Sequence, residues 1–323
     1  MLRAVVLTTV DSCQIPSLDG LVQLTRECRV NVPIRLERPA TRLKSLLVRK
    51  ACVVLPGAPN ALFARVIEDL GFEAVYITGA GIANMSLGVP DIGLVTLSEL
   101  ADHVAAISDA VAVPVLADAD TGFGNPVNMV RTVRVLERAG AAGIQIEDQV
   151  FPKKCGHFRG KDVVPLDEMV QKVKAAVDSR RDGDFQIVAR TDARAVLGFE
   201  AALDRAHALI EAGADATFVE APTSVEELAA IARALPVPQI ANMVFGGLTP
   251  PVPQAELAKM GFGAVLYANA ALQAALKSVR EVLASLKSHG SLEEVRDRLA
   301  SFEERQRAVA KDHYDSLEAR YTE

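Results

Sequence analysis

One cysteine lies among cationic residues in the segment FPKKCGHFRGK, residues 151–161. Two lysines precede Cys155, and Gly156 and His157 follow it. Nearby positive charge stabilises a thiolate, so the proton of this thiol should be lost more easily than that of an ordinary cysteine. The glycines and the proline of the segment favour a bent, movable backbone. We therefore predict a reactive thiol on a loop, which could act as a nucleophile, an acid or a metal ligand.

A second group of chemically capable residues consists of carboxylates that close two successive apolar runs. Asp118 and Asp120 are two residues apart, so on an extended backbone both would project to the same face. Glu147 closes the next run. Three carboxylates in an apolar environment repel one another unless a cation holds them, and oxygen ligands suit Mg²⁺ or Mn²⁺. The alternative is that these acids form salt bridges with Arg131 or Arg190.

The elements that must position these groups alternate along the chain from residue 51 onward. Segments with apolar residues at helical spacing, several of them closing on Ala-Gly, separate short β-rich runs. Near-continuous apolar strands between amphipathic helices imply a buried parallel sheet. Eight such units predict a (β/α)8 barrel, and the lack of a GxGxxG motif argues against a dinucleotide-binding sheet. The expected strands are 52–58, 74–80, 114–120, 143–149, 185–191, 216–222, 238–244 and 264–270.

Polar side chains close six consecutive predicted strands, from the second to the seventh. In barrel enzymes the active site is built at the carboxyl ends of the strands. Turn formation is the alternative explanation for any one of these residues, but it does not account for six strands in a row. Small residues in ITGAG, residues 77–81, offer backbone N–H groups that could bind a carboxylate or phosphate. The strand-end residues are Tyr76, Thr78, Asp118, Asp120, Glu147, Asp148, Arg190, Asp192, Glu220 and Asn242.

Composition limits the classes of partner. The 323 residues are 50% hydrophobic and carry a net charge of −6, from 35 basic and 41 acidic residues. This balance gives no reason to expect nucleic acid or an anionic membrane as a partner. No run of apolar residues is long enough to span a bilayer. Four scattered cysteines indicate a reducing compartment, so we expect a cytoplasmic protein. The expected partner is a small-molecule substrate.

Three regions are expected along the chain. Residues 1–40 carry no motif and are interpreted as an N-terminal extension that can be poorly ordered. Residues 41–290 form the barrel, and residues 291–323 form a C-terminal helical extension. The runs 272–287 and 295–321 are amphipathic and exceed what a barrel needs, so we expect their apolar face to be buried against another subunit. The alternative is a tail that packs on its own barrel.

Seven short motifs together resemble one known superfamily. In chain order they are YITGAG, SLGVPDIG, LADADTGFG, IEDQ, KKCGH, ARTDA and FVEAP, and they span about residues 45–290. Their order and spacing resemble the isocitrate lyase/phosphoenolpyruvate mutase superfamily. The KKCGH form is similar to the lyase branch, which includes methylisocitrate, 2,3-dimethylmalate and petal-death-type lyases and oxaloacetate acetylhydrolase.

This resemblance implies an α/β barrel that cleaves C–C bonds in 2-hydroxy or 2-oxo di- and tricarboxylates with Mg²⁺. Asp118 would approach the metal directly, while Asp120 and Glu147 would hold it through water. The predicted catalytic residues are Cys155, Tyr76 and Arg190. The predicted substrate-binding residues are Thr78, Gly79, Ala80, Asp91, Lys153, Gly156, His157, Glu220 and Asn242.

The resemblance also implies a role for the cysteine. In a retro-aldol cleavage a carbanion develops on the departing acid, and Cys155 would protonate it as a general acid when its loop closes. Mg²⁺ would stabilise the keto-acid fragment. Subunits of the superfamily exchange a C-terminal helix, which implies dimers that pair into tetramers.

Two segments bear on the substrate. Ala268 stands where methylisocitrate and dimethylmalate lyases have proline and oxaloacetate acetylhydrolases have serine, whereas NMVFGGLTP, residues 242–250, is similar to the petal-death and dimethylmalate type. We therefore predict a lyase of the 2-alkylmalate or methylisocitrate kind. The alternatives are an oxaloacetate hydrolase or decarboxylase, a carboxyphosphonoenolpyruvate mutase, or a non-catalytic binding barrel.

Overall fold

The computed structural model describes residues 37–154, 156 and 160–322. The chain divides into two compact units, residues 1–37 and 38–323, and the elements below all belong to the second. The expected N-terminal extension, residues 1–40, lies outside the described residues up to residue 36. Its last residues enter a helix, α2, which begins at Pro39.

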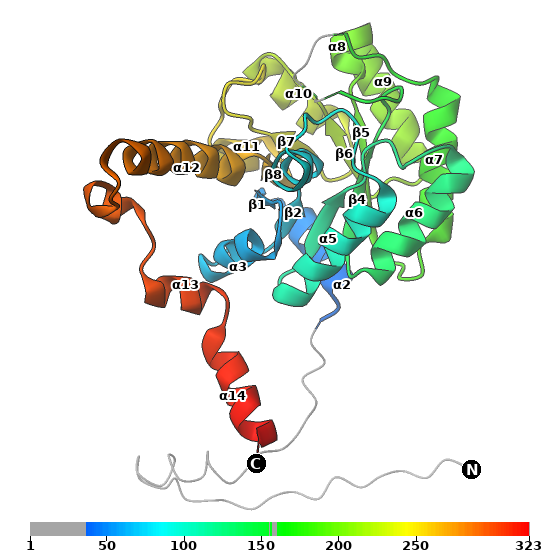
Figure 1. Ribbon diagram of the computed structural model, residues 1–323. Helices are drawn as coiled ribbons and strands as arrows, with labels where there is room; N and C mark the ends of the chain where they lie inside the picture. Colours follow the sequence, from blue (N-terminus) through cyan, green and yellow to red (C-terminus); the bar gives the residue numbers. More distant parts are fainter. Residues whose placement is uncertain (1–36, 155, 157–159, 323) are drawn as a thin grey trace, which may run out of the picture. The chain divides into compact units, whose positions relative to one another are not determined.

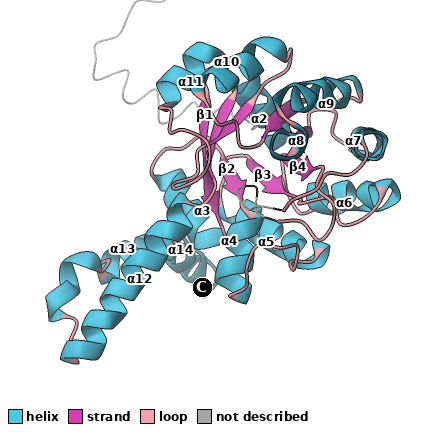
Figure 2. Cartoon of the chain, turned by 90° about the horizontal axis from the view of Figure 1, so that it is seen from above, coloured by secondary structure: helices cyan, strands magenta, loops and turns pink. Residues whose placement is uncertain are grey.

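Eight parallel strands are arranged in the order β6-β5-β4-β3-β2-β1-β8-β7 (Figures 1 and 2). The two strands at the ends of this order are linked by a single parallel bridge, Thr217–Gln239, so the barrel is nearly closed. Each strand lies within a predicted run, and the (β/α)8 prediction is confirmed. The strands are β1 Val53–Ala58, β2 Val75–Ile77, β3 Val115–Asp118, β4 Gly143–Glu147, β5 Gln186–Thr191, β6 Ala216–Val219, β7 Ile240–Asn242 and β8 Ala264–Tyr267.

Several helices between the strands begin at residues whose side chains cap them, among them α3, α5, α6 and α10. Thr96 and Glu99 form a reciprocal capping box, as do Asn125 and Asn128, and each satisfies N–H groups of a first helical turn. These local signals fix where a helix can start. The helices of the barrel are α3 Ala61–Asp69, α4 Gly79–Ile82, the π-helix η1 Ala83–Leu87, α5 Leu97–Ala110, α6 Pro126–Arg138, α7 Leu166–Ser179, α8 Ala193–Leu197, α9 Phe199–Glu211, α10 Val225–Ala234 and α11 Gln254–Met260.

Helix α2, Pro39–Val48, covers the amino-terminal end of the barrel. Leu43 and Leu47 are fully buried, and they pack with the side chains that fill the barrel interior. On the polar side of α2, Thr41 and Lys44 donate to Asp184, which lies just before β5. The predicted boundary between residues 40 and 41 therefore falls inside this helix.

The barrel has an apolar interior and an apolar layer between strands and helices. Leu55, Leu116, Val188, Phe218 and Leu266 belong to the interior cluster. Two further clusters pack the outer strand faces against the helices. This packing holds the strands rigidly, so that side chains at their carboxyl ends have fixed positions.

The C-terminal region is helical, as predicted, but the run 295–321 is divided. The long helix α12, Ala270–His289, is followed by the 3₁₀ helix η2, Glu293–Arg298, and by α13, Phe302–Ala308, and α14, Lys311–Thr322 (Figure 1). A new capping box at Ser301 and Glu304 starts α13 and explains the break. Among the described residues, no helix combines the length and apolar character needed to cross a bilayer.

Candidate active site

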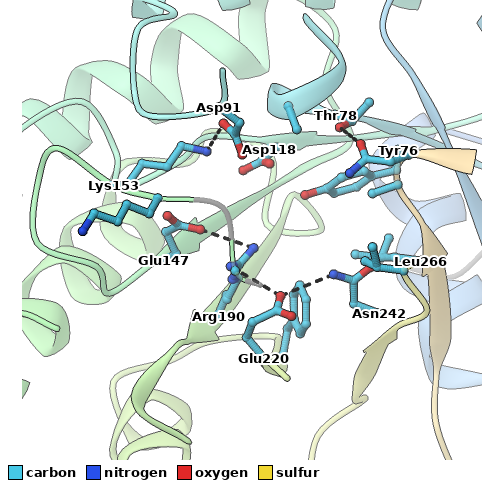
Figure 3. Close-up of a pocket in the computed structure, with 17 residues that line it drawn as sticks. Tyr76, Thr78, Asp91, Asp118, Glu147, Lys153, Arg190, Glu220, Asn242 and Leu266 are labelled. Carbon is cyan, nitrogen blue, oxygen red and sulfur yellow. Dashed lines mark hydrogen bonds and ion pairs between the residues drawn. The ribbon is translucent and has the colours of Figure 1, made fainter. Parts of the chain in front are cut away.

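The carboxyl ends of the strands enclose a small polar pocket (Figure 3). Its cavity of about 40 Å³ has room for roughly three water molecules. Most of the predicted site residues line it, although they come from segments spread over almost 200 positions. The lining residues are Tyr76, Thr78, Ala80, Asp91, Asp118, Glu147, Lys153, Lys154, Gly156, Arg190, Phe218, Glu220, Asn242, Val244, Leu266, Ala268 and Asn269.

The two predicted metal-ligating aspartates lie together, but not for the reason given by strand alternation. Strand β3 ends at Asp118, and Asp120 has a left-handed backbone with φ of +47°. The chain turns there, and the Asp120 N–H donates to Asp118 Oδ1 at 3.1 Å. A Cβ atom on Gly79 would lie 3.3 Å from Asp118 Oδ2 and 3.4 Å from Asp120 Oδ1. Both carboxylates therefore face the same glycine, which leaves them space.

Lys153 supplies positive charge to this acidic group. Its ammonium pairs with Asp91 (Figure 3). It also lies 2.8 Å from Asp120 Oδ1. Burial lowers the pKa of Lys153, but the surrounding carboxylates outweigh burial and raise it well above its usual value. Burial raises the pKa of Asp120 to about 6, with Asp118 and Asp91 adding to the effect and Lys153 opposing it. The single ammonium of Lys153 therefore does not balance the negative charge of Asp91, Asp118 and Asp120.

Glu147 ends β4 in the position predicted for a third metal ligand. Its Oε2 lies 3.4 Å from Arg190 NH1, so the predicted alternative, a salt bridge, is present for this residue. Its Oε1 is buried and has no hydrogen-bond partner among the described residues. Burial raises the pKa of Glu147 well above its usual value, although Arg190 and Lys153 oppose this.

The donor chemistry fits a hard divalent cation, because buried carboxylate oxygens that lack enough positive charge are what Mg²⁺ binds. Asp118 and Glu147 provide such oxygens at the cavity, and Asp120 provides one beside Asp118 without lining the cavity. Within the part of the chain that the structure describes, however, no three acidic, histidine or cysteine side chains are gathered closely enough to hold a metal ion. The role of these three carboxylates as metal ligands therefore stays a prediction.

Arg190 at the end of β5 is the buried cation on the opposite side of the cavity. Asp192 receives two hydrogen bonds from it, Nε to Oδ2 at 2.9 Å and NH2 to Oδ1 at 3.1 Å. Its NH2 also lies 3.4 Å from Glu220 Oε2, and its guanidinium carbon lies 5.2 Å from the centre of the Phe218 ring. Burial lowers the pKa of Arg190, but these carboxylates outweigh burial, so the group stays charged.

Hydrogen bonds orient the remaining predicted side chains. The Tyr76 hydroxyl donates to Gln145 Oε1 at 2.9 Å, and Gln145 Nε2 lies 3.4 Å from Asp118 Oδ1. Burial raises the pKa of Tyr76 well above its usual value, and the Asp118 charge adds to this, so the phenol stays protonated. Asn242 Nδ2 donates to Glu220 Oε2 at 3.3 Å (Figure 3).

The predicted carboxylate-binding segment forms the start of α4. Thr78 caps this helix and accepts a hydrogen bond from the Gly81 N–H at 3.1 Å. Gly79 and Ala80 are the first helical residues, whose N–H groups have no partner within a helix. Their position beside Asp118 and the cavity suits an anionic ligand.

The predicted lid segment meets the pocket at Gly156. A Cβ atom there would lie 2.5 Å from Arg190 NH2 and 2.7 Å from Glu220 Cδ, so glycine alone allows this close approach. The predicted residues Cys155 and His157 lie outside the described residues. Lys154 is held by Gln149, whose side chain accepts from its N–H and donates to its carbonyl, each at 2.8 Å.

Five lining residues were missed by the sequence reasoning: Lys154, Phe218, Val244, Leu266 and Asn269. Phe218, Val244 and Leu266 form an apolar wall, and Asn269 accepts a weak hydrogen bond from the Thr78 hydroxyl at 3.4 Å. Asn269 lies two residues after the end of β8, so the rule applied to six earlier strands would have found it. Phe218 and Leu266 carried no signal, because apolar residues within a strand are expected on either face of it.

An eight-stranded α/β barrel with a polar pocket at the carboxyl ends of its strands has the architecture of a barrel enzyme. The family model described as phosphoenolpyruvate phosphomutase matches residues 43–287. The chain belongs to the phosphoenolpyruvate mutase/isocitrate lyase superfamily, as its seven motifs predicted.

Two similar relatives are named as lyases. The chain is 48% identical over 265 residues to a 2,3-dimethylmalate lyase of Eubacterium barkeri, covering 82% of this chain and 92% of the relative. It is 48% identical over 264 residues to a 2-methylisocitrate lyase of Aeropyrum pernix, covering 82% and 85%.

Solved structures agree with the sequence relatives. A crystal structure of 2,3-dimethylmalate lyase superposes with a TM-score of 0.83 and 36% identity over 88% of this chain and 95% of that one. Phosphonopyruvate hydrolase in complex with oxalate and Mg²⁺ superposes with a TM-score of 0.81 and 32% identity over 89% and 100%.

Proposed function

We propose that this protein is a Mg²⁺-dependent carbon–carbon lyase that cleaves a 2-hydroxy di- or tricarboxylate into a 2-keto acid and a carboxylic acid. The substrate is of the 2-alkylmalate or methylisocitrate kind. The observation that carries the proposal is the pairing, in one cavity, of a buried arginine with an aspartate pair that is short of positive charge. The two lyase relatives at 48% identity support the same reaction class.

The metal would be held by Asp118, with Asp120 and Glu147 contributing through water. When bound, the divalent cation would neutralise these carboxylates and stabilise negative charge that develops on the keto-acid fragment. The keto-acid carboxylate is bound by the N–H groups at the start of α4, with Thr78, Gly79 and Ala80 in contact.

The other protein groups bind the substrate and move its protons. Arg190, with Asn242 and Glu220 beside it, binds a substrate carboxylate opposite the aspartates. The neutral Tyr76 hydroxyl, whose one proton is donated to Gln145, accepts a hydrogen bond from the substrate. When the C–C bond breaks, its electron pair stays on the departing acid, and the thiol of Cys155 supplies the proton that converts this carbanion into C–H. The substrate hydroxyl releases its proton to solvent as its carbon becomes a carbonyl, and one proton from solvent restores the Cys155 thiol, so the cleavage leaves the number of protons unchanged.

The apolar wall favours a substrate that carries an alkyl group. Phe218, Val244, Leu266 and Ala268 line the cavity on the side of Arg190 and Asn242. Burying one methyl group there contributes about 1 kcal/mol to binding. Oxaloacetate carries no methyl group and lacks this contribution. This is the reason for placing the lyase reaction ahead of oxaloacetate hydrolysis.

A panel of 2-hydroxy acids with Mg²⁺ tests the proposal, with release of keto acid measured. We expect turnover of 2-alkylmalates or methylisocitrate that stops on exhaustive chelation and returns with added Mg²⁺. Release of oxalate and acetate from oxaloacetate, without turnover of any alkylated acid, would instead establish the hydrolase. Absence of turnover with every acid would favour a binding barrel.

We further propose a cytoplasmic homo-oligomer, assembled as a dimer of dimers. Helix α12 has no buried residue in the single chain, and Leu276, Val279 and Leu283 on it are each more than half exposed. Such an apolar face is normally covered by another subunit. Light scattering at micromolar concentration should give a mass of about four chains, and a monomer would refute the assembly.

A further inference from the structure

Lys161 has no role in the chemistry above, yet its ammonium is buried beside the site. Its side chain is 2% exposed. The Nζ atom lies 2.6 Å from Asp192 Oδ1, and it also donates to the carbonyl oxygen of Gly156. A buried ammonium is costly unless it is paired, so these two partners determine where the side chain lies.

The first partner, Asp192, is shared between two cations. Its Oδ1 accepts from both Lys161 Nζ and Arg190 NH2, and its Oδ2 accepts from Arg190 Nε. Burial raises the pKa of Asp192, but Arg190 and Lys161 outweigh burial, and the pKa lies below its usual value. Because Lys161 neutralises part of this carboxylate, more of the Arg190 charge remains available to an anionic ligand.

The second partner, Gly156, is in contact with the same arginine. A Cβ atom at Gly156 would lie 2.5 Å from Arg190 NH2, so the glycine backbone packs directly on the guanidinium. The hydrogen bond from Lys161 to the Gly156 carbonyl holds it there. Lys161 therefore acts on Arg190 from two directions, through Asp192 and through Gly156.

The backbone of Lys161 is itself fixed relative to β4. The Val150 N–H donates to the Asp162 carbonyl at 2.9 Å, and the Val164 N–H donates to the Asp148 carbonyl at 2.8 Å. Gln149 and Val163 form an antiparallel bridge between these two bonds. The lysine side chain thus extends from a rigid base.

We propose that Lys161 is a positioning residue, which holds Gly156 on Arg190 and sets how strongly Arg190 binds a ligand carboxylate. The inference rests on the proposed function in one respect, namely that Arg190 binds a carboxylate of the ligand. Without the lysine, Arg190 would be surrounded by Asp192, Glu147 and Glu220 with one buried positive charge fewer, and its affinity for anions would fall.

The test compares Lys161→Met, which removes the charge, with Lys161→Arg, which keeps it. Lys174→Met on the exposed face of α7 is the matched control. Oxalate binding to the full chain is measured by calorimetry with Mg²⁺ present. Loss of a hydrogen-bonded charge predicts roughly 10- to 100-fold weaker binding for Lys161→Met. Lys161→Arg should recover most of that loss, and Lys174→Met should bind like the wild type.

Hydrogen exchange of the amide of Gly156, the residue that Lys161 holds through its carbonyl, supplies a readout independent of any substrate. We expect Lys161→Met to accelerate it while exchange in α5 stays unchanged. The proposal is overturned if Lys161→Met binds oxalate with wild-type affinity and shows wild-type hydrogen exchange. Accelerated exchange throughout the barrel would also overturn it, because it would indicate a general role in folding. If the wild type binds no oxalate, the proposed function fails. The exchange measurement then tests the positioning role of Lys161 by itself, with the same outcomes supporting or overturning it.

Discussion

Gly156→Ala isolates the contribution of the loop backbone that lies on Arg190. The new methyl carbon would lie 2.5 Å from Arg190 NH2 and 2.9 Å from Glu220 Cγ. Comfortable contacts are about 3.5 Å or longer, so the overlap is about 1 Å. We therefore expect the effect to come from these contacts.

The loop, rather than the arginine, should move to relieve the overlap. Two hydrogen bonds to Asp192 hold Arg190, which also packs over the Phe218 ring. A displacement of about 1 Å near the reacting atoms can cost about 100-fold in rate. We therefore expect kcat/KM for the cleaved acid to fall about 100-fold, with a loss of about 1 kcal/mol in the free energy of unfolding.

The assay is Mg²⁺-dependent keto-acid release, followed together with oxalate affinity and thermal unfolding. Gly183→Ala is the control, because a Cβ atom there would meet no described atom within 4 Å, and its kinetics should match the wild type. The reasoning is refuted if Gly156→Ala keeps both the wild-type kcat/KM and the wild-type oxalate affinity. A collapse of its melting temperature would also refute it, because the overlap would then have been absorbed by the barrel.

Three further perturbations test other parts of the site and the fold. Asp118→Ala should abolish Mg²⁺-dependent turnover while the melting temperature is kept, because the change removes repulsion together with a ligand; full activity after exhaustive chelation would exclude the metal. Cys155→Ser should slow cleavage by about 10²–10⁴-fold, since a hydroxyl gives up its proton far less readily than a thiol. An adduct on Cys155, seen by mass spectrometry during wild-type turnover, would show a nucleophile instead. Hydrogen bonds from Lys44 and Thr41 lower the pKa of Asp184, so its stabilising effect is present above about pH 4 and is lost as the pH falls through the lowered value. Asp184→Asn should therefore melt below the wild type at pH 7, with the two melting temperatures converging near pH 2; a constant difference at all pH values would contradict this assignment.

The sequence by itself determined the architecture, because the signals for strands and helices are local. Strand β3, Val115–Asp118, lies inside the predicted run 114–120, and the capping pairs at Thr96 and Asn125 mark where helices start. Closure of the barrel follows from burying eight apolar strands between amphipathic helices. Because parallel strands bring their carboxyl ends to one side, the strand-end rule also located Arg190 and Glu220 at the pocket.

The tertiary structure decided which of these groups meet and how their charges are balanced. Asp118 and Asp120 converge through a left-handed turn, which spacing in the sequence cannot distinguish from strand alternation. Lys153 reaches Asp91, more than sixty residues earlier, and Lys161 reaches Asp192 across the loop. Such pairings depend on the register of distant strands and on the course of loops. Both are fixed by packing of the whole barrel, and no local pattern of residues records them.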